Sequence, residues 1–241
     1  MINKSRVLAG VFAPEFDGGL ANRNLQEINS KPLIEHACLQ LERSKLVDQI
    51  LFATNSKKTQ DFLSQKGYEF ESRLVFDHSE AMVQFDKCAM KTLELRKGFD
   101  FLLMVDVGYP LRNESDIDAV LTLSDRYSGA PTVTIQDTRL AGKNLQYVDS
   151  NRVLSSVFST GQAGDSSESE RKIYEISFSA CAASRKYLEM NGSFFGAQTR
   201  AYLVPDERAL KIDNKTDLVF AQALMARRFG VASSNTGQAT G

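Results

Sequence analysis

The stretch VLAGVFAPEFDGGLANRN, residues 7–24, joins an apolar run to a glycine-containing loop and decides which fold the rest of the chain must complete. The run Val7–Ala13 carries no charge and predicts a buried strand. It leads into a loop that contains Gly18 and Gly19 and closes with Arg23 and Asn24. Loops that follow buried strands are where α/β proteins hold phosphates, so we expect these four residues to contact a nucleotide.

Two acidic residues leave the chemistry of this loop open. Glu15 and Asp17 stand where phosphate binding favours Lys or Arg, and carboxylates there repel a phosphate. The backbone N–H groups around Gly18 and Gly19 can still form a concave anion site. The loop is therefore either a phosphate site built from backbone or an ordinary surface loop.

Outward from this loop, strand-like and helix-like segments alternate along the chain. We predict strands at Val7–Ala13, Gln49–Thr54, Phe99–Val107 and Pro131–Gln136, and helices at Pro32–Ser44, Lys57–Lys66, Ser79–Arg96 and Glu114–Tyr127. Ser115 and Asp118 resemble a capping box for the last of these helices. Such alternation requires a mostly parallel sheet covered by helices, so the predicted fold is a three-layer α/β/α domain over residues 1–230.

The pattern fails over residues 138–172, which are rich in Ser, Gly and charge. This composition predicts an irregular lid or subunit contact. Order returns with strands predicted at 174–183, 200–205 and 209–213, and with helices predicted at 184–190 and 216–229. Residues 231–241 have the composition of a flexible tail.

Composition excludes several classes of function. The chain of 241 residues carries 29 Lys and Arg against 30 Asp and Glu, and no basic stripe, so we expect no nucleic-acid partner. No window is apolar enough for a membrane span, and the N-terminal segment lacks a signal-peptide pattern, which predicts a cytoplasmic protein. The three cysteines lack metal-ligand spacing and are predicted to be buried apolar residues.

Three segments, in order, carry a resemblance to one known family. They are LANRNLQEINSKPLIEHACLQLERSKLVDQILFATNS (20–56), DFLLMVDVGYPLRNESDIDAVL (100–121) and GSFFGAQTRAYLVPDERALKIDNKTDLVFAQAL (192–224). Together they resemble the acylneuraminate cytidylyltransferases, which join CMP from CTP to sialic-acid-type sugars. The resemblance implies a GT-A-like nucleotidyltransferase fold, a homodimer, CTP and an acidic sugar as substrates, and Mg²⁺ as the cofactor.

The chain departs from the family at the positions that carry the chemistry. The family's loop A-R-x-G-S-K matches residues 13–18, where its Arg and Lys are both missing, whereas its Lys-Asn pair matches Arg23-Asn24. A Gln of the family matches Asp106, and the first Asp of its D-I-D-T motif matches Lys211. The second Asp is kept as Asp213. The resemblance therefore implies the family's scaffold with a rewritten active site.

A carboxylate lost at Lys211 and one gained at Asp106 suggest a relocated metal site. Asp106 ends a central strand, where ligands of open α/β sheets bind, and with Asp213 it offers two oxygen ligands for Mg²⁺. Both are therefore candidate catalytic and metal-binding residues. The alternative is that Lys211 neutralises one of them in a salt bridge. Asp217 is better explained as an acid at the start of a helix.

The acceptor site has one candidate. Arg112 can bind a carboxylate or phosphate through two nitrogens, and the alternative is that it closes a turn at the surface. We therefore expect a CMP-sugar synthetase that uses CTP, Mg²⁺ and an acidic sugar. Two other functions stay open, a non-catalytic homologue that binds a nucleotide, a sugar or a partner, and a related transferase with another nucleotide or acceptor.

Overall fold

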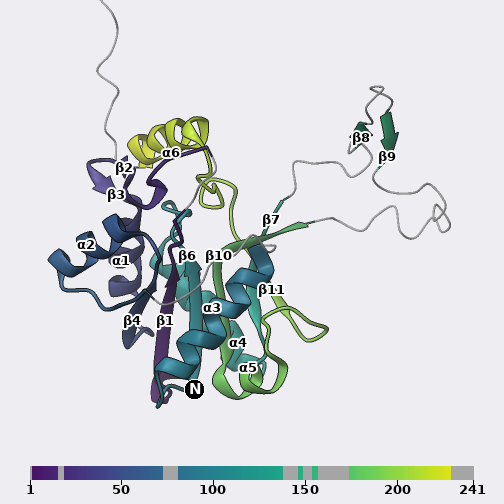
Figure 1. Ribbon diagram of the computed structural model, residues 1–241. Coiled ribbons are helices and arrows are strands. Elements are labelled where there is room, and N and C mark those ends of the chain that lie inside the picture. The colour runs from purple at the N-terminus through teal and green to yellow at the C-terminus, as the bar shows by residue number, and fades with distance from the viewer. Residues whose placement is uncertain are drawn as a thin grey trace, which may run out of the picture.

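A central sheet with helices on both faces forms the body of the protein in the computed structural model (Figure 1). The structure describes residues 2–15, 19–72, 81–137, 146–148, 154–156 and 174–228. Most of the predicted irregular segment 138–172 and all of the predicted tail 231–241 lie outside these residues. No helix among the described residues is long and apolar enough to cross a membrane.

Seven strands form the sheet in the order β11-β7-β10-β6-β1-β4-β5. Their bounds are β1 (Val7–Phe12), β4 (Gln49–Ala53), β5 (Phe70–Glu71), β6 (Phe101–Asp106), β7 (Thr132–Asp137), β10 (Tyr174–Ser184) and β11 (Arg200–Leu203). β10 runs antiparallel to both of its neighbours, and the other pairs are parallel. The predicted mostly parallel sheet is confirmed.

Short elements complete the description. Two hairpins pair β2 (Glu27–Ile28) with β3 (Lys31–Pro32) and β8 (Gln146–Val148) with β9 (Leu154–Ser156). The helices are α1 (Leu33–Arg43), α2 (Lys57–Lys66), α3 (Ala81–Leu95), α4 (Glu114–Arg126), α5 (Arg185–Asn191) and α6 (Lys215–Arg228), with single 3₁₀ turns at η1 (Ile2–Lys4) and η2 (Arg23–Leu25).

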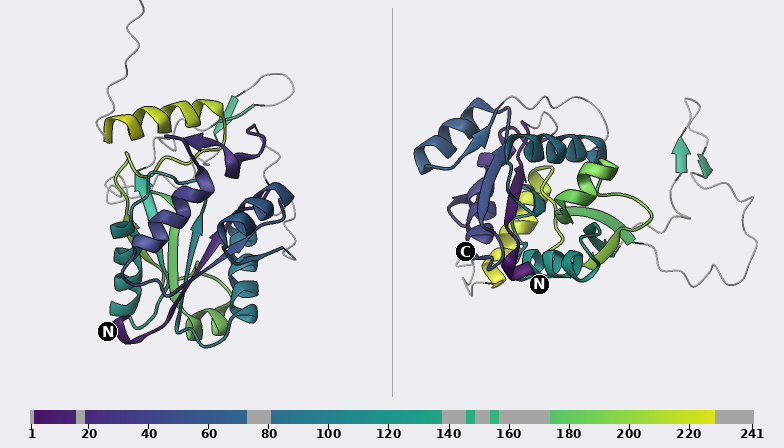
Figure 2. Two further views of the ribbon diagram at one scale, coloured as in Figure 1. Left: turned by 90° about the vertical axis from the view of Figure 1, so that its left-hand side faces the viewer. Right: turned by 90° about the horizontal axis from the view of Figure 1, so that it is seen from below.

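The helices form two layers because successive side chains of a strand point to opposite faces. In β1, Val7, Ala9 and Val11 enter the core that includes α1 and α4, whereas Leu8 and Phe12 enter the core that includes α3. Figure 2 shows α3 and α4 on opposite faces of the sheet. The predicted three layers are confirmed, and the three cysteines are buried and unbridged as expected.

Two sequence-based details of the fold were wrong. Residues 209–213 form no strand, because Ile212 makes a single backbone bond to the turn at Gly108 and has no neighbouring strand to continue the ladder. The capping box of α4 is built by Asn113 and Asp116, not by Ser115 and Asp118. Asp118 instead accepts a hydrogen bond of 2.6 Å from Ser44, a partner that is distant in sequence.

Candidate functional site

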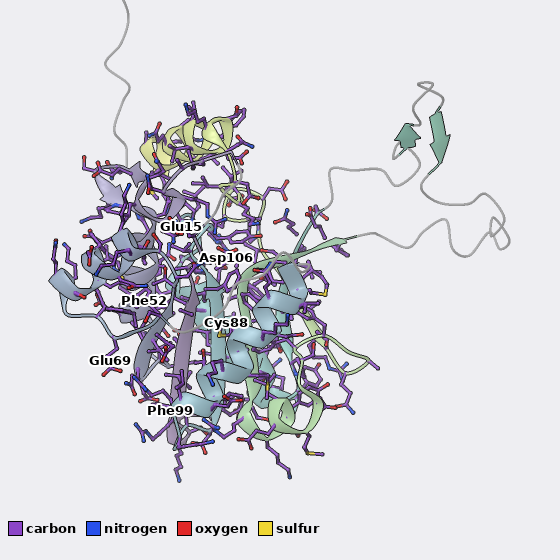
Figure 3. All side chains as sticks on the ribbon, in the orientation of Figure 1. Glu15, Phe52, Glu69, Cys88, Phe99 and Asp106 are labelled. Atoms are coloured by element: carbon purple, nitrogen blue, oxygen red, sulfur yellow. The ribbon has the colours of Figure 1, made fainter. Side chains whose placement is uncertain are left out.

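The candidate site lies where β1 and β6 end side by side. Phe12 and Asp106 are paired as the last residues of these two parallel strands. In Figure 3 Asp106 lies at the end of the sheet nearest α6, and Phe99, which precedes β6, lies at the opposite end. The carboxyl edge of the sheet is therefore the edge that α6 crosses (Figure 1).

Arg23 brings the two predicted metal ligands together. One terminal nitrogen, Nη2, lies 3.4 Å from Oδ1 of Asp106, and the other, Nη1, lies 3.1 Å from Oδ1 of Asp213. The Arg23 side chain is 2% exposed and that of Asp106 is 5% exposed. Lys211 Nζ lies 3.1 Å from the same oxygen of Asp213, which is the salt bridge that the sequence left as an alternative.

A glycine turn after β6 makes room for this cluster. The Gly108 N–H donates to Oδ1 of Asp106 at 2.7 Å. A Cβ at position 108 would lie 3.1 Å from that oxygen and 3.3 Å from Nη1 of Arg23. A side chain at this position would therefore crowd the cluster. Gly108 was not among the site residues predicted from the sequence. The feature of the sequence that could have identified Gly108 is its position, two residues beyond the end of a central strand.

The loop that carries Lys211 and Asp213 is held at both ends. The Ile212 N–H donates to the Gly108 carbonyl at 2.9 Å, which attaches the loop to the turn after β6. Oδ2 of Asp217, in the first turn of α6, accepts from the N–H groups of Asp213 and Asn214 at 2.9 and 3.0 Å. Asp217 therefore lies at the start of α6, as predicted, and its side chain also fixes the backbone just before the helix.

The residues predicted to bind a nucleotide surround the same point. Gly19 has a φ of +69°, and a Cβ there would lie 3.2 Å from the Asp213 carbonyl, so the first loop passes directly against the Asp213 loop. Asn24 is buried and donates to the carbonyls of Ala13 and Pro14 at 3.0 and 3.1 Å, which fixes the end of β1. Gly18 lies outside the described residues.

Arg112 is placed differently from the other candidates. In place of the expected contact with a substrate, Arg112 is only 1% exposed, and its guanidinium donates to Oε1 of Gln40 at 2.9 and 3.1 Å. It also donates to the carbonyls of Asp106, at 3.2 Å, and Ser179. Burial lowers the pKa of Arg112 to about 10, which leaves the group charged at neutral pH. These contacts tie the end of β6 to α1 and β10, and they favour a structural role.

The geometry of Asp106 and Asp213 bears on whether they can share a metal ion. Both carboxylates contact one cationic group, the Arg23 guanidinium, through its two terminal nitrogens. Two carboxylates together with substrate phosphates are a donor set that Mg²⁺ accepts. Among the described residues no group of three or more His, Cys, Asp or Glu side chains is arranged as a metal site. The pair therefore fits a metal that a nucleotide helps to hold.

A cavity of about 560 Å³ adjoins the cluster. It lies against the end of β7, the start of β10 and the side of α6, and it includes Lys211 and Asp213. This volume is within the range of small-molecule sites. Its lining also includes Asp137, Glu175 and Asp206, and Lys211 is the single cation among the described residues that line it.

The chain is similar in sequence to known proteins. A family model described as cytidylyltransferase matches residues 18–89, the part of the chain that begins in the first loop. This match places part of the chain, residues 18–89, in similarity to the cytidylyltransferases. Over most of its length the chain is also similar to two curated proteins. It is 25% identical to "Post-translational flagellin modification protein B" of Campylobacter coli, covering 93% of this chain and 97% of that protein. It is 24% identical to "CMP-N,N'-diacetyllegionaminic acid synthase" of Campylobacter jejuni, covering 92% and 96%.

Solved structures with the same fold support the architecture of this chain. CMP:2-keto-3-deoxy-manno-octonic acid synthetase in complex with CTP matches with a TM-score of 0.66 at 14% identity, over 93% of this chain and all of that one. The 4-diphosphocytidyl-2C-methyl-D-erythritol synthase of Anaerococcus prevotii matches with a TM-score of 0.61 at 15% identity, over 94% and 98%. The predicted nucleotidyltransferase fold is confirmed, and the match of residues 18–89 and the two curated relatives agree with the predicted resemblance.

Proposed function

We propose that the protein is a cytidylyltransferase of the CMP-sugar synthetase type. It transfers CMP from CTP to a hydroxyl of an acidic sugar and releases pyrophosphate. The observation that carries this proposal is the cluster of Arg23, Asp106 and Asp213 at the carboxyl ends of β1 and β6, in a chain whose relatives include CMP-sugar synthases.

The reaction breaks the bond between the α-phosphorus of CTP and the oxygen that leaves with pyrophosphate, and it forms a bond from the α-phosphorus to the sugar oxygen. The hydroxyl proton is released in the process. Negative charge grows on the departing pyrophosphate, so cationic groups that face it lower the barrier. Arg23 lies in the loop predicted to hold the triphosphate and can supply such a charge.

Asp106 and Asp213 would hold Mg²⁺ in this reaction. Bound there, the ion would neutralise charge on the α-phosphate and on the leaving group. Asp106 has the more rigid position, because its side chain is 5% exposed and accepts from the Gly108 N–H, whereas the Asp213 side chain is 39% exposed. We expect Asp106 to be the stronger determinant of activity for this reason.

The cavity beside Asp213 is the proposed place for the sugar. Lys211 is the cation of its described lining, so we assign the sugar carboxylate to Lys211 in place of Arg112. Asp137, Glu175 and Asp206 then face the donor groups of the sugar, its hydroxyls or N–H groups. Lys211→Gln is expected to raise the KM for the acidic sugar more than the KM for CTP.

Nucleotide binding is the first test. Thermal unfolding is measured with CTP, UTP, ATP and GTP, each with and without Mg²⁺, because a ligand at about 100 times its Kd stabilises a protein by about 2.7 kcal/mol. We expect a shift with CTP and Mg²⁺ that exceeds the shifts with the other nucleotides. A shift with another nucleotide alone would favour the related transferase instead.

Turnover is the second test, followed as pyrophosphate release with CTP and a panel of acidic sugars. Asp106→Asn is expected to lower the rate by about 100-fold or more. Asp61→Asn is the matched control, because Asp61 is 52% exposed on α2 and pairs with Lys57. Full turnover by Asp106→Asn would refute the assignment, and CTP binding without turnover of any sugar would favour the non-catalytic homologue.

We also infer that the protein works as a homodimer in the cytoplasm. The dimer rests on the family resemblance, and exposed Val219 and Phe220 on α6, at 63% and 61%, agree with a covered surface there. Sedimentation equilibrium measures the mass directly. A monomer at micromolar concentration would refute the dimer.

A further inference from the structure

Arg23 occupies the point at which the two carboxylates of the site meet. Its two terminal nitrogens divide between Asp106 and Asp213, at 3.4 and 3.1 Å, so one guanidinium bridges both groups. The carboxylates come from distant parts of the chain, 83 and 190 residues away from Arg23. The guanidinium is buried with Asp106, since the two side chains are 2% and 5% exposed, whereas the Asp213 side chain is 39% exposed. Water therefore screens the contact between Arg23 and Asp106 weakly.

Among the described residues, the ion pairs of the cluster join two cations to two anions without a metal ion. Arg23 and Lys211 carry two positive charges, and Asp106 and Asp213 carry two negative charges. A buried carboxylate needs a charged partner, because removing an unpaired charge from water is costly. Arg23 is that partner for Asp106. Without Arg23, the unpaired carboxylate of Asp106 would favour binding of a metal ion. Arg23 supplies the positive charge in its place.

A divalent ion and the guanidinium compete for the same oxygens. Mg²⁺ binds its oxygens at about 2.0–2.1 Å and prefers a regular octahedron. The Oδ1 atoms of Asp106 and Asp213 both face the guanidinium. A dication between those two atoms would lie directly against the positive charge of Arg23. We infer that Arg23 is a resident counter-ion of the metal site, which must leave the carboxylates before a divalent metal binds there.

The position of Arg23 suggests where its side chain goes. Arg23 starts η2 and follows Gly19 and Asn22, whose φ angles of +69° and +51° shape the first loop. The next residue, Asn24, is tied to the carbonyls of Ala13 and Pro14, so the backbone is held and the side chain is the part that can move. A triphosphate in this loop offers Arg23 a new anionic partner; this step rests on the proposed function.

Each charged group keeps a partner of opposite charge through this exchange. The guanidinium passes from two carboxylates to a phosphate, and the two carboxylates pass from the guanidinium to the metal. Metal and nucleotide then strengthen each other's binding. The nucleotide gives Arg23 a phosphate in place of the two carboxylates, and the metal gives the two carboxylates a cation in place of Arg23. The protein without nucleotide is expected to bind divalent metal weakly at this site.

The test measures Mn²⁺ binding in the absence of any nucleotide, by the loss of the free-ion electron paramagnetic resonance signal. Wild type is compared with Arg23→Gln, with Arg23→Gln/Asp106→Asn and with the control Arg96→Gln, which removes an arginine that pairs with exposed Glu69 far from the site. We expect Arg23→Gln to bind Mn²⁺ about tenfold more tightly than wild type or more. The added Asp106→Asn change should abolish that gain, and Arg96→Gln should match wild type.

Equal Mn²⁺ affinity in wild type and Arg23→Gln would overturn the inference, as would a gain that survives Asp106→Asn. Circular dichroism establishes that each variant is folded. If Arg23→Gln does not fold, Arg23→Lys replaces it, because a single ammonium cannot bridge both carboxylates as a guanidinium does. Arg23→Lys is then expected to bind Mn²⁺ more tightly than wild type, and no gain would overturn the inference. These measurements contain no CTP, so they fail or succeed separately from the proposed activity.

Discussion

Replacing Arg112 with Met tests whether this buried arginine supports the fold or binds the substrate. Met fills part of the space but has no donors, so three buried acceptors lose their partner: Oε1 of Gln40 and the carbonyls of Asp106 and Ser179. An unsatisfied buried acceptor costs about 1–3 kcal/mol. Three acceptors at the low end of this range give a loss of about 3 kcal/mol in the free energy of unfolding.

The assay is urea unfolding followed by circular dichroism. A lower midpoint with an unchanged slope means a loss of stability alone. The matched control is Arg96→Met, which removes an arginine that pairs with the 56% exposed Glu69, and it should change stability by about 0.5 kcal/mol or less. An unchanged midpoint for Arg112→Met, together with a raised KM for the acidic sugar, would refute the structural role and restore the contact expected from the sequence.

Three further predictions concern the scaffold. Burial lowers the pKa of His36 below 6.5, so the unfolded chain takes up its proton first and stability falls as the pH drops below about 6.5. His36→Gln should flatten that part of a stability–pH curve, and an unchanged curve would contradict this account. Gly129→Ala should cost at least about 1 kcal/mol in denaturant unfolding, because φ is +79° and a Cβ would collide with Ser184; equal stability would rule out this strain. Asp116→Asn should cost about 2 kcal/mol, because the fully buried carboxylate accepts two bonds of 2.9 Å from Arg208, and a midpoint equal to that of Asp61→Asn would be inconsistent with this.

Local patterns in the sequence were sufficient for the fold class and for most helices and strands. The predicted strands Val7–Ala13 and Gln49–Thr54 differ from β1 and β4 by one residue at one end, and the predicted helix Lys57–Lys66 has the bounds of α2. These predictions are accurate because the periodicity of apolar residues, which indicates a strand or a helix, can be read from neighbours along the chain. The pattern also placed Asp106 correctly at the end of a central strand.

Contacts between distant segments were decided only by the tertiary structure. No local pattern indicates that β10 enters the sheet antiparallel between β6 and β7, or that residues 209–213 lack a neighbouring strand. The same holds for the site, where Arg23 meets Asp213 across 190 residues and Arg112 is buried against Ser179. The sequence gives the type of each side chain. Its partner depends on which loops meet at the edge of the sheet. The kinds of charge at this site could therefore be predicted, and their pairing could not.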